Sequence, residues 1–307
     1  MFHLVAAKRL LKGYYFASSI EEAIAYLIAH RGEGQIVGGG TVLLPQVQRQ
    51  EALASFLADI SRIGNMRRIV ETEEGIIVGG AVTFAKLCDH ELIRKRAPLL
   101  SEAAERLGTP QIRQLATLGG NIAAGRGNAL GAVALLAMEA QVEITNSTGP
   151  QWIPIRGLLG RRGTPRVDSS SEIITAFQVP ALVPGQGTAV AILPCSPPET
   201  QSPYVLAVNL GLEEGGDRFL WGILTVGCLG ATPTHLGEIE EWLLDLSPYD
   251  THTPGAIGAA IRDEAVENRR LSETPIARYD QIALLAAEAL SRALSMARQT
   301  AQGIFAP

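Results

Sequence analysis

Two glycine-rich segments are the residues best suited to bind a ligand without help from charged side chains. IVGGGTVL occupies residues 36–43, and TLGGN occupies residues 117–121. Consecutive backbone N–H groups in such a turn form an anion-binding concavity, and a missing Cβ lets a diphosphate approach closely. Alone, Gly38-Gly39-Gly40 predicts only a turn. Two such segments, each beside an apolar run, favour a bound diphosphate.

Other nucleotide and hydrolase sites are not indicated. GGGTVL is not a GxGxxG motif that leads into a helix, and GxxxxGK[ST] and GxSxG are absent. The carboxylate pairs, the five histidines and the pair Arg161-Arg162 are most simply solvated or capping residues. Since no catalytic group of side chains emerges, an enzyme built on this chain would rely on a cofactor for its chemistry.

The composition of the chain indicates its class of protein. The chain has 307 residues, 47% of them hydrophobic and 19% charged, with a formal charge of −5. This balance favours a globular protein of two domains and argues against a nucleic-acid-binding surface. The three cysteines are far apart, which predicts no metal on this chain and a reducing compartment. With no signal-like N-terminus and no apolar stretch long enough to span a bilayer, we expect a cytoplasmic protein.

The patterns in the first 180 residues alternate between helix and strand. Helices are expected at 20–29, behind the capping-box spacing of Ser18 and Glu21, and at 84–93, 98–113 and 133–138. Strands are expected at 35–37, 75–80, 141–145 and 171–180, with a further apolar segment at 53–60. A loop of small residues is expected after Gly119-Gly120.

The remaining residues predict a second, smaller unit. Residues 183–203 are rich in proline and glycine and mark the expected domain boundary. Beyond them, 204–212 and 219–229 read as a hairpin, and 236–246 and 282–297 as helices. The fold class is therefore α+β.

Several of these segments resemble a known family. SIEEAIAYL, IVGGGTVLLP, GIIVGGAVTFAKL, PLLSEAAERLGTPQIRQLATLGGNIA and SEIITAFQVP occur in order, within residues 15–180. They resemble the FAD-binding (medium) subunit of molybdenum hydroxylases, the group of xanthine dehydrogenase and aerobic carbon monoxide dehydrogenase. ARYDQIALLAAEALSRAL resembles, more weakly, the last helix of that family's C-terminal domain.

The resemblance implies a fold and a cofactor site. Residues 1–182 would form a two-lobed FAD-binding domain of the PCMH or vanillyl-alcohol-oxidase type, with lobes at about 1–62 and 63–182. Residues 183–307 would form a small C-terminal α/β sandwich. Both glycine segments would face the FAD diphosphate, and Leu107 and Ile174 would be apolar contacts. The implied cofactor-binding residues are Val37, Gly38, Gly39, Gly40, Thr41, Val42, Leu107, Thr117, Gly119, Gly120, Asn121, Asn128 and Ile174.

The implied role is electron transfer. FAD would accept electrons that a molybdopterin large subunit releases through an iron–sulfur small subunit, and would pass them to NAD⁺, oxygen or a quinone. Molybdopterin and iron–sulfur clusters would belong to the partner subunits, with no catalytic side chain and no metal on this chain.

Two departures from the family pattern bear on the cofactor. Leu130 occupies the position of an expected aspartate, which Asn128 could replace only if the loop shifts. Residues 192–198 lack an expected lysine and arginine pair. A lost charge-assisted hydrogen bond costs about 1.5–3 kcal/mol, so FAD is expected to bind, but more loosely. The alternatives are a degenerate paralogue that acts as a scaffold with weak or no FAD binding, and a free-standing flavin oxidoreductase.

Overall fold

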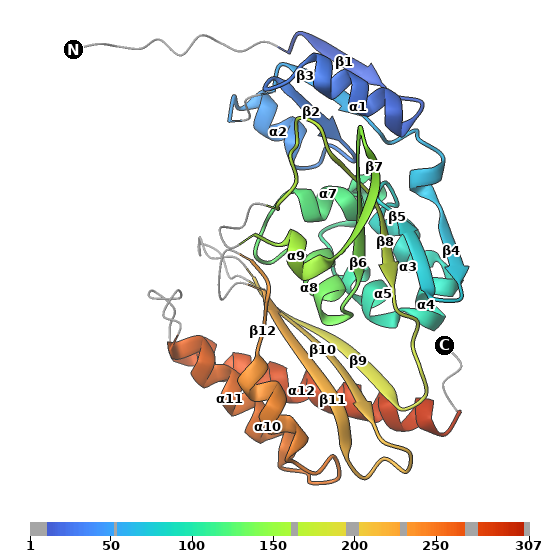
Figure 1. Cartoon of the computed structure of the whole chain (residues 1–307). Helices are drawn as coiled ribbons and strands as arrows, with labels where there is room; N and C mark the ends of the chain where they lie inside the picture. The colour runs from blue at the N-terminus through green and yellow to red at the C-terminus, as the bar shows by residue number, and fades with distance from the viewer. Residues whose placement is uncertain are drawn as a thin grey trace, which may run out of the picture.

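The computed structural model describes residues 11–51, 54–160, 165–194, 203–227, 232–267 and 276–303. Its strands form three separate sheets of three, five and four strands. Figure 1 shows these sheets one after another down the molecule, in the order of the chain. Cys195 and Cys228 lie outside the described residues. Within those residues, no helix is both long enough and apolar enough to cross a bilayer.

The first layer is a parallel sheet with two helices. Its strands β1 (Gly13–Phe16), β3 (Phe56–Asp59) and β2 (Gly34–Val37) lie in that order. The predicted first helix is confirmed as α1 (Ile20–Ala29), and α2 (Leu43–Gln48) follows the glycine triplet. The capping partner of α1 is Glu22 rather than Glu21. The Ser19 hydroxyl accepts the Glu22 N–H at 3.2 Å, and the Glu22 carboxylate accepts the Ser18 N–H at 2.9 Å.

A tyrosine–aspartate hydrogen bond ties β1 to β3 and predicts a pH dependence. The Tyr14 hydroxyl donates to Asp59 Oδ2 at 2.5 Å, and burial followed by this carboxylate raises the pKa of Tyr14 to about 12. Because the pKa is higher in the folded state, this stabilisation is complete below pH ~10, the ordinary tyrosine value. It is lost as the pH rises towards 12. Tyr14→Phe should therefore flatten the fall in stability above pH ~10, measured by urea unfolding at stepped pH. An unchanged slope would contradict this assignment.

The second layer is an antiparallel sheet with strand order β4-β5-β8-β6-β7. Its strands are β4 (Ile69–Thr72), β5 (Gly75–Gly79), β8 (Ile173–Val179), β6 (Gln141–Asn146) and β7 (Gly149–Pro154). The helical elements are η1 (Asn65–Arg67), α3 (Phe84–Asp89), α4 (Glu91–Arg96), α5 (Pro98–Glu105), α6 (Pro110–Leu115), α7 (Leu118–Ala123), α8 (Leu130–Ala137) and α9 (Ile155–Leu158). The predicted strands of this layer are confirmed, whereas β4 and β7 are additions.

The helices of this layer differ from expectation in three places. The predicted helix 84–93 is two helices, because the extended backbone of His90 ends α3 and starts α4. The predicted helix 98–113 is two helices, because Gly108 adopts φ +45° and Thr109 and Pro110 start a new helix. The small-residue loop expected after Gly119-Gly120 is confirmed at residues 124–129, but it begins only after α7, so both glycines lie inside the first turn of a helix. The hydroxyl of Thr117 caps this helix, which overrides the low helix propensity of the glycines.

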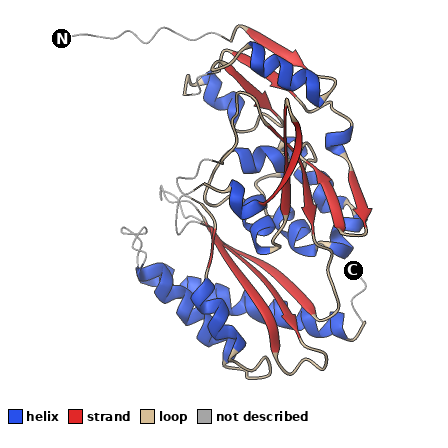
Figure 2. Cartoon of the chain, viewed as in Figure 1, coloured by secondary structure: helices blue, strands red, loops and turns tan. Residues whose placement is uncertain are grey.

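The third layer is an antiparallel sheet covered by helices. Its strands β12 (Thr234–His235), β11 (Phe219–Gly227), β10 (Tyr204–Leu212) and β9 (Gln186–Leu193) lie in that order. The helices are α10 (Gly237–Leu244), α11 (Thr253–Glu267) and α12 (Ile276–Ala301), which pack along one face of the sheet (Figure 2). The hairpin and two of the helices are confirmed. Residues 183–203 are more than a linker, since they contain β9.

The other face of this sheet packs on the second layer. Along β10, Val205 and Ala207 join the core of α8, while Tyr204 and Leu206 join the core of α12. Burial on both faces explains why β10 is apolar along its length except at Asn209. Polar contacts secure the same junction. Asn209 donates to the Ala137 carbonyl at 2.9 Å, and the side chain of Glu102 pairs with Arg292 and accepts the Val190 N–H at 2.9 Å.

Candidate functional site

A cleft of about 410 Å³ lies between the first and second layers. Its lining residues come from β2, α2, α7 and the start of β8, and Figure 1 shows β2 and α2 above α7. Its size is within the roughly 300–1,000 Å³ of small-molecule sites. The lining residues are Gln35–Leu43, Gln46, Ile60, Gly80, Ala116, Thr117, Gly119, Gly120, Asn121, Ala123, Ala124, Pro165, Val167, Ser169 and Glu172–Ile174.

Most of the predicted site residues meet in this cleft. It is lined by Val37, Gly38, Gly39, Gly40, Thr41, Val42, Thr117, Gly119, Gly120, Asn121 and Ile174. The structure does not bring Leu107 and Asn128 to it. Leu107 packs on the core of the second layer, and the Asn128 backbone lies against Gly227 of β11. Leu130 is only 7% exposed within that core, so an apolar side chain suits its position.

The glycine triplet is required by contacts within the protein. A Cβ on Gly39 would stand 1.8 Å from the Leu115 carbonyl oxygen, and one on Gly38 would stand 2.6 Å from Thr117 Oγ1. Gly40 adopts φ +68°, a conformation that side chains rarely accept. The triplet therefore lets the two layers approach each other, in addition to leaving its backbone open to the cleft.

The first glycine segment carries the free donors of the site. Among the described residues, none of the five backbone N–H groups from Gly38 to Val42 has a hydrogen-bond acceptor. The Thr41 hydroxyl also lacks a protein partner in the described chain and lines the cleft. Residues 38–42 are half-buried, and a run of unpaired N–H groups in a turn that opens onto a cleft is suited to an anion.

The second glycine segment is hydrogen-bonded within the protein. The Leu118 N–H donates to the Val82 carbonyl at 2.9 Å, and the Gly119 N–H donates to the Gly80 carbonyl at 2.8 Å. The Gly120 N–H donates to Thr117 Oγ1 at 3.2 Å. The first turn of α7 therefore forms a wall of the cleft and holds it in place, but has no unpaired N–H to offer an anion.

Thr117→Val tests this supporting role. The substitution keeps the side-chain shape and removes the oxygen that caps α7, which should lower the free energy of unfolding by about 1 kcal/mol. Thr117→Ser keeps the cap and should leave stability within about 0.5 kcal/mol. Urea unfolding of the three proteins measures the difference. Equal stability of the valine and serine variants would show that the cap contributes nothing.

Two further polar side chains shape the cleft. Asn121 Oδ1 accepts the Gly131 N–H at 3.0 Å and so fixes the start of α8, while its amide nitrogen has no acceptor in the described chain. Glu172 is the one charged residue of the described lining, and its carboxylate accepts the Asp168 N–H at 2.8 Å.

The sequence did not predict the polar lining residues Gln35, Gln46 and Glu172. Only the position of Gln35, two residues before Val37 on the same strand, offered a signal.

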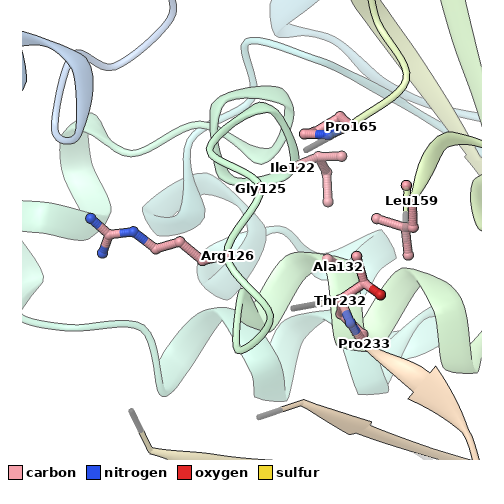
Figure 3. Close-up of a pocket in the computed structure, with 9 residues that line it drawn as sticks. Ile122, Gly125, Arg126, Ala132, Leu159, Pro165, Thr232 and Pro233 are labelled. Atoms are coloured by element: carbon pink, nitrogen blue, oxygen red, sulfur yellow. The ribbon is translucent and has the colours of Figure 1, made fainter. Parts of the chain in front are cut away.

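A second cavity, beside Ile122 and Ala132, is far smaller. It measures about 10 Å³ and is bounded by Leu159, Pro165 and Pro233. Figure 3 shows the Arg126 side chain extending away from the other lining residues. This volume holds one water molecule at most. The large cleft is therefore the candidate site.

Comparison with known proteins identifies the family of the region that contains this cleft. A family model described as "FAD binding domain in molybdopterin dehydrogenase" matches residues 7–182, more than half of the chain. The chain belongs to this family. The membership confirms the resemblance inferred from the sequence, and the matched residues include both glycine segments.

Relatives and solved structures extend the comparison. The chain is 32% identical to the xanthine dehydrogenase FAD-binding subunit of Escherichia coli O157:H7, over 54% of this chain and 57% of that protein. It is 32% identical to the carbon monoxide dehydrogenase medium chain of Hydrogenophaga pseudoflava, over 57% and 61%. The match thus spans about three-fifths of the length of these relatives. The solved Hydrogenophaga carbon monoxide dehydrogenase has a TM-score of 0.77 at 23% identity, with 94% and 97% of the two chains covered. This likeness confirms the predicted fold.

Proposed function

We propose that the chain is the flavoprotein subunit of a molybdenum hydroxylase and binds FAD in the cleft between its first two layers. The observation that carries this proposal is the run of unpaired N–H groups from Gly38 to Val42. Such a run matches the diphosphate of FAD, whose oxygens need several donors at once. Family membership supports the choice of FAD among nucleotides.

Different residues of the cleft would contact the diphosphate and the rings of FAD. The N–H groups of 38–42 and the Thr41 hydroxyl would donate to the diphosphate, and the Asn121 amide nitrogen would add a donor from α7. Ile60, Ile173 and Ile174 would exclude water from the rings. Bound FAD would supply the redox chemistry, since its ring system accepts electrons singly and releases them singly or in pairs.

The binding would depend on neutral donors. No cationic side chain lines the described part of the cleft. Ile192, Leu193 and Pro194 occupy part of the stretch where basic residues were expected, and residues 195–198 lie outside the described chain. Charge-assisted hydrogen bonds are about twice as strong as neutral ones. We therefore propose that FAD binds here more loosely than a site with such a cation would allow.

We propose the following arrangement for the whole chain. Residues 1–182 would form the FAD-binding domain, with lobes at about 1–62 and 63–182, and residues 183–307 the C-terminal domain. In a cytoplasmic complex, an iron–sulfur small subunit would deliver electrons from a molybdopterin large subunit, and NAD⁺ or another acceptor would receive them. The names of the relatives, a FAD-binding subunit and a medium chain, support a place in such a complex.

The flavin content of the purified full-length chain tests the proposal. We expect a yellow protein with a flavin absorbance band, or a colourless one that becomes yellow after incubation with FAD and desalting. A chain that cannot be reconstituted with FAD would overturn the proposal and favour a scaffold subunit. Co-purification of iron–sulfur and molybdopterin subunits would distinguish a complex from a free-standing flavin oxidoreductase.

A further inference from the structure

Gln35 carries an unpaired amide in the wall of the cleft. Its Oε1 atom is enclosed and has no hydrogen-bond partner, and its amide nitrogen donates to none of the described residues. Gln35 nevertheless lines the cleft. An enclosed polar atom without a partner destabilises the folded chain, and a polar group of a bound ligand beside Gln35 would supply the missing partner.

The position of Gln35 separates it from the anion-binding turn. Gln35 lies on β2, opposite Leu57 of β3, three residues before Gly38. At a rise of about 3.3 Å per residue, its Cα lies roughly 10 Å along the strand from the first free N–H group. A group bound at the turn is therefore out of reach of this amide, and the partner must be another part of the ligand.

The cleft that Gln35 lines has room for a flat ring. Ile36, Ile60 and Ile173 offer it apolar walls, and Ile36 faces the side of β2 opposite to Gln35. With one end of the amide enclosed, the other end can offer one donor or, after a half-turn, one acceptor to the polar edge of a heteroaromatic ring. Rotation of the amide by a half-turn exchanges its two ends, so either end can turn towards the ligand.

We propose that the Gln35 amide pairs with a heteroaromatic edge of the bound cofactor and thereby selects the cofactor and fixes its position. This inference rests on the proposed function. FAD has two edges of this chemistry, one on the adenine and one on the pyrimidine part of the flavin. In either case Gln35 supplies recognition that the backbone donors of 38–42 do not, because those donors bind any diphosphate.

The test compares Gln35→Met, which keeps the length of the side chain without its hydrogen-bonding groups, with Gln48→Met as a matched control. Gln48 is an exposed residue of α2 outside the cleft lining. The full-length proteins are titrated with FAD, FMN and ADP by calorimetry. If the partner is adenine, FAD and ADP bind about tenfold more weakly and FMN is unaffected. If the partner is the flavin, FAD and FMN weaken and ADP does not.

A stability measurement separates recognition from damage to the fold. Without ligand, the Gln35→Met chain should melt no lower than the wild type, because the variant lacks the enclosed unpaired oxygen. Gln35→Glu, which keeps the acceptor and loses the donor, should also bind more weakly. Wild-type affinity for all three ligands in Gln35→Met would overturn the inference. Failure of the wild-type chain to bind any of them would overturn the proposed function instead.

Discussion

Gly39→Val should remove bound flavin from the chain and destabilise the fold at the same time. The new Cβ would meet the Leu115 carbonyl oxygen at 1.8 Å and its carbon at 2.5 Å, both backbone atoms that cannot rotate away. The turn 38–42 and the segment before α7 must then separate, at a cost of about 3 kcal/mol. Because the free N–H groups move with the turn, we expect less than about a tenth of the wild-type flavin content.

Gly64→Val is the matched control for this substitution. Gly64 precedes η1, its φ is −57°, and a Cβ there would meet no atom within 4 Å. It should keep the wild-type flavin content and lose less than about 1 kcal/mol of stability. The absorbance ratio of flavin to protein after desalting, with urea unfolding, measures both effects. Normal flavin content in Gly39→Val would show that the cofactor binds elsewhere.

Asn121→Asp should weaken FAD binding while the fold keeps its stability. A carboxylate oxygen can still accept the Gly131 N–H, and a negative charge beside the start of α8 is favourable. The amide nitrogen, however, becomes a second anionic oxygen facing the proposed diphosphate. At a separation of about 8 Å and an effective dielectric constant of about 20, the repulsion is about 2 kcal/mol, or about thirtyfold in affinity.

Asn128→Asp provides the same chemical change outside the cleft. Asn128 lies in the connection that follows α7, whereas Asn121 lies within α7, and Asn128 does not line the cleft. It should change FAD affinity by less than about threefold. Titration with FAD at low and high salt compares the two variants, and the deficit of Asn121→Asp should shrink with added salt. A larger effect at Asn128 than at Asn121 would contradict the position of the diphosphate.

The elements of the chain follow from local patterns in most cases. The cap and apolar stripe of α1, the β-branched runs of β2 and β5, and the turn between β10 and β11 are all local features, and each element forms where it was expected. Other elements were not predicted, because local signals conflict there. The glycines in α7 and α11 argue against a helix, and the prolines and glycines of 183–203 argue against β9. Capping of α7 by Thr117 and pairing of β9 with β10 override these propensities.

The sequence by itself determined the family and the cofactor class, because several short motifs occur in the order typical of the family, and eleven of the thirteen residues that this resemblance implied line the cleft. Only the tertiary structure decided how the two glycine segments differ. The Leu118 and Gly119 N–H groups pair with the carbonyls of Val82 and Gly80, which are distant in sequence. Among the described residues, the run of unpaired backbone N–H groups in the two glycine segments therefore lies on residues 38–42. The tertiary structure also brought Gln35 and Glu172 to the cleft and kept Leu107 and Asn128 away from it. Such pairings depend on how the layers pack, which no local spacing specifies.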